Sequence, residues 1–446
     1  MTRVITYGTY DLLHQGHINL LKRAKELGDY LIVGVTSDSF DRGRGKLNVR
    51  NNVLERVEAV KATGYADEVI IEDYLGQKID DIQNYDVDIF AIGSDWEGKF
   101  DYLSEYCKVV YLPRTEGISS TMLREESQTV YRIGVVGCGR IANRFVPETK
   151  VVNGAEVTAV YNPDKAESES FAQQHGLSAY TNYDVFLNDI DLVYVASPHL
   201  THYNYVMKAL SAEKHVLCEI PFVLSKEQAL ELYKLAEERN LVLLEASKTA
   251  FCPAFGHIVT LVKSGIIGEV VDVKSSLSKM VPPPTRELDS EQAGGAMNEH
   301  GPLTLLAIIK LLGIDWLDVD FHSKMDNGVD IYTKGVINYP HATASFTVGI
   351  GVKTEGNLVI SGTKGYIYVP APWWLTSYFE VRYEDQTKNK KYFYSYDGEG
   401  LRYEIQEWLS MIVNNRRSCY KLRRRESVVI AEIIEKYRNG ENVTEI

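Results

Sequence analysis

The sequence of 446 residues has few cysteines and no hydrophobic run long enough to cross a membrane. Its five cysteines form no C-x-x-C pair, which argues against a zinc knuckle and against a disulfide framework. A run of about eighteen apolar residues is missing, and a strand-like stretch at residues 4–7 leaves no room for a signal peptide. We therefore expect a soluble, cytoplasmic protein with no membrane partner.

Basic residues are scarce relative to acidic ones. Lys and Arg total 48 against 61 for Asp and Glu, a net charge of −13, which argues against a general nucleic-acid binder. Apolar residues make up 45% and charged residues 24%, a globular balance that excludes a disordered or collagen-like chain. The length predicts two or three domains.

Strands and helices alternate over the first 127 residues, which predicts a parallel sheet covered on both faces. Helical patterns occupy residues 17–28 and 77–85, and strand patterns occupy residues 3–9, 30–38, 67–73, 88–93 and 108–113. The polar segment 120–130 has helical character at first and then reads as a domain junction.

The alternation restarts at residue 131, and the pattern changes to longer β-rich runs after residue 253. Those runs predict a mostly antiparallel sheet, followed by helices at residues 401–413 and 427–437. We expect an α/β protein of three domains: 1–127, Rossmann-like; 131–252, a Rossmann domain; and 253–446, an α+β domain with the C-terminal helices.

The first chemical motif follows the first predicted strand. It reads Gly8-Thr9-Tyr10-Asp11-Leu12-Leu13-His14-Gln15-Gly16-His17, with two histidines where a helix begins. Free N–H groups and the helix dipole attract phosphate there, and Gly16 allows close approach. Nucleotidyl transfer needs hydrogen-bonding groups on the charge that develops on the phosphates. The alternative is a pair of helix-capping histidines.

Residues 1–127 resemble the cytidylyltransferase family, and within it the glycerol-3-phosphate cytidylyltransferases. The resemblance is carried by Tyr7–His14, Ala24–Tyr30, Ser94–Phe100 and Tyr111–Thr121. It implies catalytic roles for His14 and His17, and for Lys46 in a lid over the phosphates, although that loop also fits a solvated basic turn. The implied CTP-binding residues are Gly8, Thr9, Tyr10, His14, His17, Asp95, Arg114, Thr115, Ser119 and Thr121.

The sequence departs from this family at Gly64, where members commonly carry an arginine. The acceptor therefore need not be glycerol 3-phosphate itself. We expect Mg²⁺ to arrive with the triphosphate of CTP, because no carboxylate cluster suggests a protein metal site.

The second motif, Gly137-Cys138-Gly139-Arg140-Ile141-Ala142, follows an apolar strand pattern and has dinucleotide-binding spacing. Residues 131–446 resemble NAD(P)-dependent oxidoreductases of the glucose–fructose oxidoreductase and inositol dehydrogenase type, through this motif and Ala196–His199, Lys214–Glu219, Ser264–Val270 and Gly294–Ala296. The implied cofactor residues are Gly137, Gly139, Arg140, Ile141, Asn162, Ser197, Pro198, His199, His202 and Glu219. Asn162 carries no charge to repel a 2′-phosphate, so NAD and NADP are both open.

Two departures fall where the reduction chemistry would take place. The family's Glu-Lys-Pro is Glu219-Ile220-Pro221, and its Asp-x-Gly-x-His becomes Glu299 to Leu303. Reduction of a ketone still needs a proton donor, for which Lys248, Glu299 and His300 are candidates. His300 fits a buried core histidine equally well.

Joined on one chain, the two halves suggest consecutive reactions on small molecules. A reductase would convert a ketose phosphate to a polyol phosphate, and the cytidylyltransferase would activate it as a CDP-alditol, such as CDP-glycerol, for a cell-surface polysaccharide. We also expect a homo-oligomer, a dimer or higher. The alternatives are a non-catalytic oxidoreductase-like scaffold and an ATP-using relative, which the segment Arg114–Thr121 argues against.

Overall fold

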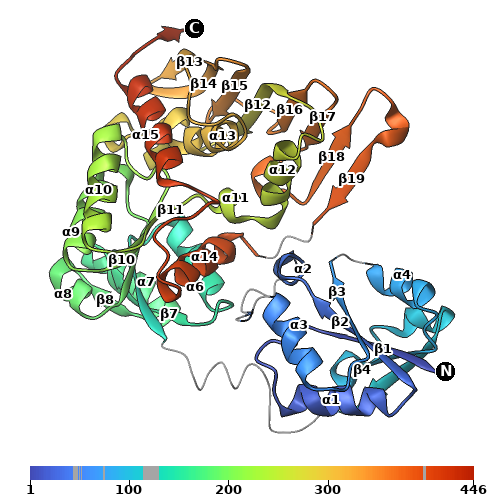
Figure 1. Cartoon of the computed structure of the whole chain (residues 1–446). Coiled ribbons are helices and arrows are strands. Elements are labelled where there is room, and N and C mark those ends of the chain that lie inside the picture. Colours follow the sequence, from blue (N-terminus) through green and yellow to red (C-terminus); the bar gives the residue numbers. More distant parts are fainter. Residues whose placement is uncertain (44–48, 50, 52, 74–75, 114–129, 395–397) are drawn as a thin grey trace. The chain divides into compact units, whose positions relative to one another are not determined.

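The computed structural model describes residues 1–43, 49, 51, 53–73, 76–113, 130–394 and 398–446. The chain divides into two compact units, Met1–Thr129 and Val130–Ile446, which we call unit 1 and unit 2. Unit 1 is drawn mainly in blue in Figure 1, and unit 2 runs from cyan to red.

Unit 1 is built on a parallel sheet of five strands in the order β3-β2-β1-β4-β5. Neighbouring residues of β1 point to opposite faces, so Val4 joins one buried apolar cluster and Ile5 the other. The strands are β1 (Arg3–Gly8), β2 (Tyr30–Thr36), β3 (Glu68–Glu72), β4 (Ile89–Gly93) and β5 (Lys108–Leu112), and the helices are α1 (Gln15–Lys25), α2 (Asp38–Gly43), α3 (Val53–Ala62) and α4 (Gln77–Asn84).

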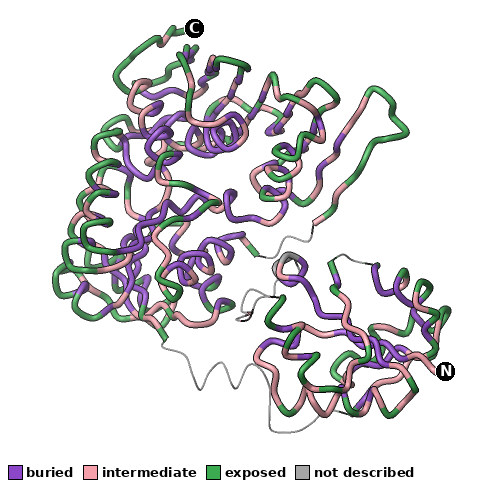
Figure 2. Tube along the Cα trace, viewed as in Figure 1, coloured by how far each residue is buried: buried purple, intermediate pink, exposed green. Residues whose placement is uncertain are grey.

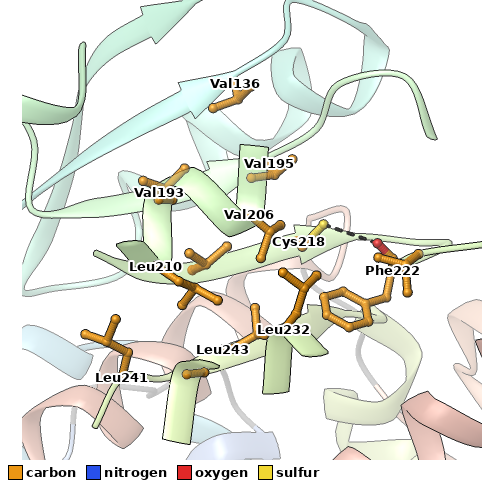
Figure 3. Packing of buried hydrophobic residues seen from close by; sticks show 14 of the residues in the cluster. Val136, Val193, Val195, Val206, Leu210, Cys218, Phe222, Leu232, Leu241 and Leu243 are labelled. Carbon is orange, nitrogen blue, oxygen red and sulfur yellow. Dashed lines mark hydrogen bonds between the residues drawn. The ribbon is translucent and has the colours of Figure 1, made fainter. Parts of the chain in front are cut away.

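Unit 2 begins with a second parallel sheet, in the order β11-β10-β9-β6-β7-β8. Figure 3 shows the apolar layer beside it, where Val193 and Val195 of one strand pack with Leu210 and Leu232 of two helices. The strands are β6 (Tyr131–Val136), β7 (Ala155–Tyr161), β8 (Ser178–Tyr180), β9 (Leu192–Val195), β10 (His215–Glu219) and β11 (Leu243–Ala246), and the helices are α6 (Arg140–Thr149), α7 (Lys165–His175), α8 (Tyr183–Asn188), α9 (His202–Ser211) and α10 (Lys226–Glu238).

The rest of unit 2 carries a mixed sheet of nine strands, in the order β19-β18-β17-β16-β12-β15-β14-β13-β20. The pairs β12–β15 and β13–β20 are parallel, and the other pairs are antiparallel. The strands are β12 (Val270–Ser278), β13 (Asp318–Asp326), β14 (Val329–Asn338), β15 (Thr343–Gly349), β16 (Leu358–Gly362), β17 (Tyr366–Val369), β18 (Tyr378–Arg382), β19 (Lys390–Phe393) and β20 (Val443–Glu445).

Five more helices belong to the described part of unit 2. Helix α13 packs on β12, β14 and β15, while α14 contacts α6 and α15 contacts α10. The last two helices, drawn in red in Figure 1, thus return to the first sheet, and a further division of unit 2 at residue 252 stays a prediction. Their bounds are α11 (Lys248–Phe251), α12 (Pro253–Lys263), α13 (Ala296–Leu312), α14 (Leu401–Val413) and α15 (Arg424–Arg438).

The α/β class and the mostly antiparallel second sheet of unit 2 are as the sequence predicts. Helix α13 was not predicted, because it is apolar on nearly every side and so shows no amphipathic period; Figure 2 shows it buried over most of its length. The helical character predicted for residues 120–130 falls almost entirely outside the described residues. None of the described helices is both long and apolar enough to span a membrane.

Candidate functional site

The two histidines of the first motif lie together at the start of α1. His14 is the N-cap residue, and its Nδ1 accepts a hydrogen bond from the Gly16 N–H at 3.1 Å. The rings of His14 and His17 are stacked with their centroids 3.9 Å apart, and the edge of Tyr10 packs on His17. The capping bond uses Nδ1 of His14, so it does not by itself exclude a phosphate-binding role for the paired imidazoles.

A buried arginine, Arg56, supports the loop before the histidines through hydrogen bonds and ion pairs. The Arg56 guanidinium donates to the carbonyl oxygen of Thr9 at 2.7 Å and lies 3.3 Å from Asp41 and 2.6 Å from Asp38. The Thr9 hydroxyl in turn donates to Asp41 at 3.1 Å. This network fixes Thr9 where the chain leaves β1. Sequence reasoning predicted neither α3 nor the role of Arg56, since an arginine among charged neighbours gives no sign of burial.

The order of the first sheet reverses between β1 and β4, where ligands of open parallel sheets bind. Gly8 is the last residue of β1 and Thr9 follows it, while exposed Asp95 follows β4 in a short 3₁₀ helix, Ser94–Trp96. Tyr10 is 1% exposed, so it belongs to the core. Predicted Lys46, Arg114, Thr115, Ser119 and Thr121 lie outside the described residues.

Unit 2 contains a cavity of about 600 Å³ at the corresponding reversal, between β6 and β9. All ten predicted cofactor residues and all three predicted proton donors line it. They come from the ends of β6, β7, β9 and β10, from the starts of α6 and α9, and from α11 and α13, so the fold brings together residues that are far apart in sequence.

The glycines at positions 137 and 139 are explained by different features of the structure. Gly137 has φ +99° and lies so close to β9 that a Cβ would come within 2.6 Å of the Ala196 carbonyl oxygen. Gly139 caps α6 in an extended conformation, and a Cβ there would meet nothing within 4 Å. Gly137 is thus required by the fold, whereas the open space at Gly139, before the free N–H groups of α6, suits a pyrophosphate. The residues present therefore fit a dinucleotide.

His202 lines the cavity and joins two backbone turns. It is 1% exposed, and its Nδ1 and Nε2 lie 2.9 Å from the Pro221 carbonyl oxygen and 2.8 Å from the Ser197 carbonyl oxygen. Burial lowers the pKa of His202. Its contacts are with the backbone, so it shapes the turns after β9 and β10.

A group of polar side chains meets at the N-terminal turn of α13. Arg286 Nη2 lies 2.8 Å from Glu299 Oε1, and His199 Nδ1 lies 3.6 Å from the same oxygen. Burial raises the pKa of Glu299 to about 7, against the opposing effect of Arg286. Burial, helped by Arg286, lowers the pKa of His199 well below its ordinary value. At neutral pH Glu299 is therefore partly protonated beside a neutral His199.

Leu303 occupies the position at which the family pattern expects a histidine, and His300 lines the same cavity as Leu303. His300 and Leu303 are three residues apart on α13, one turn of one face, and both line the cavity. The Nε2 of His300 is buried without a hydrogen bond to any described residue. Burial lowers the pKa of His300 to about 4, so the ring is neutral at pH 7.

Isoleucine replaces the family's lysine next to Glu219, a carboxyl that also lines the cavity. Tyr194 donates to Glu219 Oε1 at 2.5 Å, and burial raises the pKa of Glu219 to about 7. Ile220 lines the cavity beside it, and the nearby ammonium of Lys248 donates to the Glu399 carbonyl oxygen at 2.9 Å. Lys248 is thus partly engaged, while Glu219 and Glu299 are the acids that titrate near neutrality.

Sequence reasoning missed several basic residues of this cavity. Arg144, Lys279 and Arg286 line it together with the predicted Arg140 and Lys248. Burial lowers the pKa of Lys279, and Arg140 and Arg144 add to that effect, so these cations lie close to one another. A chain of net charge −13 therefore gathers basic side chains at one cavity. Among the described residues no group of His, Cys, Asp or Glu side chains is placed to hold a metal ion.

Residues 5–126 match the cytidylyltransferase-like family. A glycerol-3-phosphate cytidylyltransferase from Staphylococcus aureus is 52% identical over 126 residues, which is 28% of this chain and 95% of that protein. Residues 131–247 match the NAD-binding Rossmann fold of the GFO/IDH/MocA oxidoreductase family, and residues 255–368 match its C-terminal domain. The chain belongs to both families.

The oxidoreductase half also has relatives along its whole length. A trans-1,2-dihydrobenzene-1,2-diol dehydrogenase from Oryctolagus cuniculus is 28% identical over 324 residues, covering 70% of this chain and 98% of that protein. A 3-ketoreductase from Actinomadura kijaniata, solved with NADP and TDP-benzene, superimposes with a TM-score of 0.64 at 22% identity, over 71% of this chain and 99% of that one. The chain therefore joins a cytidylyltransferase domain to an NAD(P)-binding oxidoreductase domain, and both resemblances predicted from the sequence are confirmed.

Proposed function

We propose that the cytidylyltransferase domain transfers a cytidylyl group from CTP to a polyol phosphate, forming a CDP-alditol such as CDP-glycerol and releasing pyrophosphate. The stacked pair of His14 and His17 at the N-terminus of α1 is the observation that carries this proposal. An oxygen of the acceptor's phosphate attacks the α-phosphorus of CTP, and the bond to the departing pyrophosphate breaks. The two imidazoles and the first N–H groups of α1 stabilise the charge that builds up on the phosphates.

The identity to glycerol-3-phosphate cytidylyltransferases supports CTP as the nucleotide. Mg²⁺ would enter with the triphosphate. The arginine of the family pattern is Gly64 here, so the acceptor need not be glycerol 3-phosphate itself, and the other polyol phosphates stay open.

The test is pyrophosphate release by the full chain, with CTP or ATP offered together with glycerol, tetritol, pentitol or hexitol phosphates. We expect release only with CTP and one class of acceptor. Equal rates with ATP and CTP contradict the assignment.

We further propose that the oxidoreductase domain reduces a ketose phosphate and so supplies that acceptor. The basic side chains that line the cavity, including Lys279 and Arg286, support a substrate that carries a phosphate. When bound, the reduced nicotinamide supplies a hydride to the carbonyl carbon. Glu299 has a pKa of about 7, so its protonated form is available to give the proton to the carbonyl oxygen. Arg286 and His300 hold the substrate.

Oxidation of NADH or NADPH by the full chain with a panel of ketose phosphates tests this step. Adding CTP to the same mixture should convert the product to a CDP-alditol, which anion-exchange chromatography detects.

Ile220, in place of the family's lysine, favours a second candidate function for this domain: a scaffold that binds cofactor and joins chains into an oligomer. Cofactor binding without turnover on any ketose phosphate would establish that alternative.

A further inference from the structure

We propose that the oxidoreductase domain selects NAD(H) over NADP(H), and that Glu167, held by Asn162, is the residue that makes this choice. The proposal rests on cofactor binding at the cavity of unit 2. It goes beyond the sequence, in which the uncharged Asn162 left both cofactors open.

Asn162 follows β7, the strand whose end meets the 2′-hydroxyl of the adenosine ribose in dinucleotide-binding sheets. Its side-chain amide donates to Glu167 Oε2 at 2.7 Å, and its carbonyl oxygen accepts from the Asp164 N–H at 2.9 Å. Both of these bonds fix the amide group. Glu167 is thereby held at the wall of the cavity, and both it and Asn162 line that wall.

Glu167 also lies near the glycine loop that would carry the pyrophosphate. Burial raises the pKa of Cys138, between the two glycines, and Glu167 and Asp164 raise it further. Both carboxylates therefore lie near this loop, and of the two only Glu167 lines the cavity, because Asp164 caps α7. The family places an acid at the end of this strand, where this chain has Asn162. Glu167, in the first turn of α7, supplies a carboxylate at nearly the same place.

The basic residues around Glu167 do not offset its charge toward a 2′-phosphate. Lys165, on the same turn, is 77% exposed and lies 3.7 Å from Glu169, one turn along α7. Arg144 pairs with Glu399 at 3.0 Å, and Arg140 begins α6 at the pyrophosphate end of the cavity. A carboxylate in this place accepts a hydrogen bond from a ribose hydroxyl and repels a phosphate on the same oxygen.

The test is fluorescence titration of the full chain with NADH and with NADPH, which reads binding rather than turnover. NADH should bind at least about tenfold more tightly than NADPH at low salt. In Glu167→Gln the ratio of the two dissociation constants should fall severalfold toward one. Glu169→Gln is the matched control, because it removes the same charge from the same helix at a residue that does not line the cavity.

The outcomes separate this inference from the function on which it depends. If neither nucleotide binds, cofactor binding itself is wrong and the inference falls with it. If both bind but NADPH binds as tightly as NADH, or Glu167→Gln leaves the ratio unchanged, the cavity holds a dinucleotide and only the assignment to Glu167 is overturned. Tighter NADPH binding by Glu167→Lys than by wild type would support it independently.

Discussion

His14 and His17 stack ring on ring, 3.9 Å between centroids, while His14 also closes the first turn of α1 through its Nδ1. The same residue therefore has a structural role as a helix cap and a place in the candidate phosphate-binding pair. The two roles can be separated by substitutions that keep one and remove the other.

His14→Asn keeps a side chain that caps helices well, whereas His14→Ala removes both the cap and the imidazole. Both variants should lose cytidylyl transfer by about two orders of magnitude or more, as for a lost transition-state donor. Only His14→Ala should also lose about 1 kcal/mol of stability. Pyrophosphate release and thermal unfolding are the measurements, and near-normal turnover by His14→Asn would leave the histidine a cap alone.

The glycine loop of unit 2 offers a matched pair of substitutions. Gly139→Ala should fold normally, because its Cβ meets nothing within 4 Å, yet it should weaken dinucleotide binding about tenfold or more by filling the pyrophosphate space. Gly137→Ala should lower the melting temperature, since its Cβ collides with the Ala196 carbonyl oxygen and its φ is +99°. Equal NADH affinity in Gly139→Ala and wild type would place the pyrophosphate elsewhere.

Glu299 predicts the pH dependence of reduction. A proton donor acts in its protonated form, so the rate should fall about tenfold for each pH unit above its pKa of about 7. Glu299→Gln should abolish reduction while NADH titration stays unchanged. Because burial also raises the pKa of Glu219 to about 7, Glu219→Gln is the comparison that decides between the two acids. The donor is the acid whose replacement abolishes reduction while NADH still binds; if Glu299→Gln keeps the activity and its fall above pH 7, Glu299 is not the donor.

Glu245 predicts the pH dependence of stability. It is 1% exposed in β11, and burial raises its pKa to about 7 from an ordinary value of 4.5. The unfolded chain ionises first, so this carboxyl's stabilisation is complete below pH 4.5 and is lost as the pH rises to about 7, a change of about 3 kcal/mol. Glu245→Gln should lack this loss.

Urea unfolding followed by tryptophan fluorescence measures it, because four of the five tryptophans lie in unit 2. The difference in the free energy of unfolding between wild type and Glu245→Gln should change between pH 4.5 and about 7. The exposed Glu227→Gln should follow wild type at every pH.

The sequence by itself determined the two strand–turn–helix motifs, because their signals are local: an apolar strand, glycines at fixed spacing and a helix start. The motifs at Gly8–His17 and Gly137–Ala142 could therefore be placed before any contact was known. Parallel alternation also placed both at the carboxyl edge of a sheet, where ligands bind.

Only the tertiary structure decided what surrounds those motifs. Helix α13, apolar on nearly every side, gave no period, so the meeting of Glu299 with His199 and Arg286 could not be predicted. The support of Thr9 by Arg56 is likewise a contact between distant elements, whereas the bond of Asn162 to Glu167 is local and depends on how the chain turns from β7 into α7. The burial of Glu299 and His199 depends on the packed neighbours, and it sets the charge of both side chains at neutral pH.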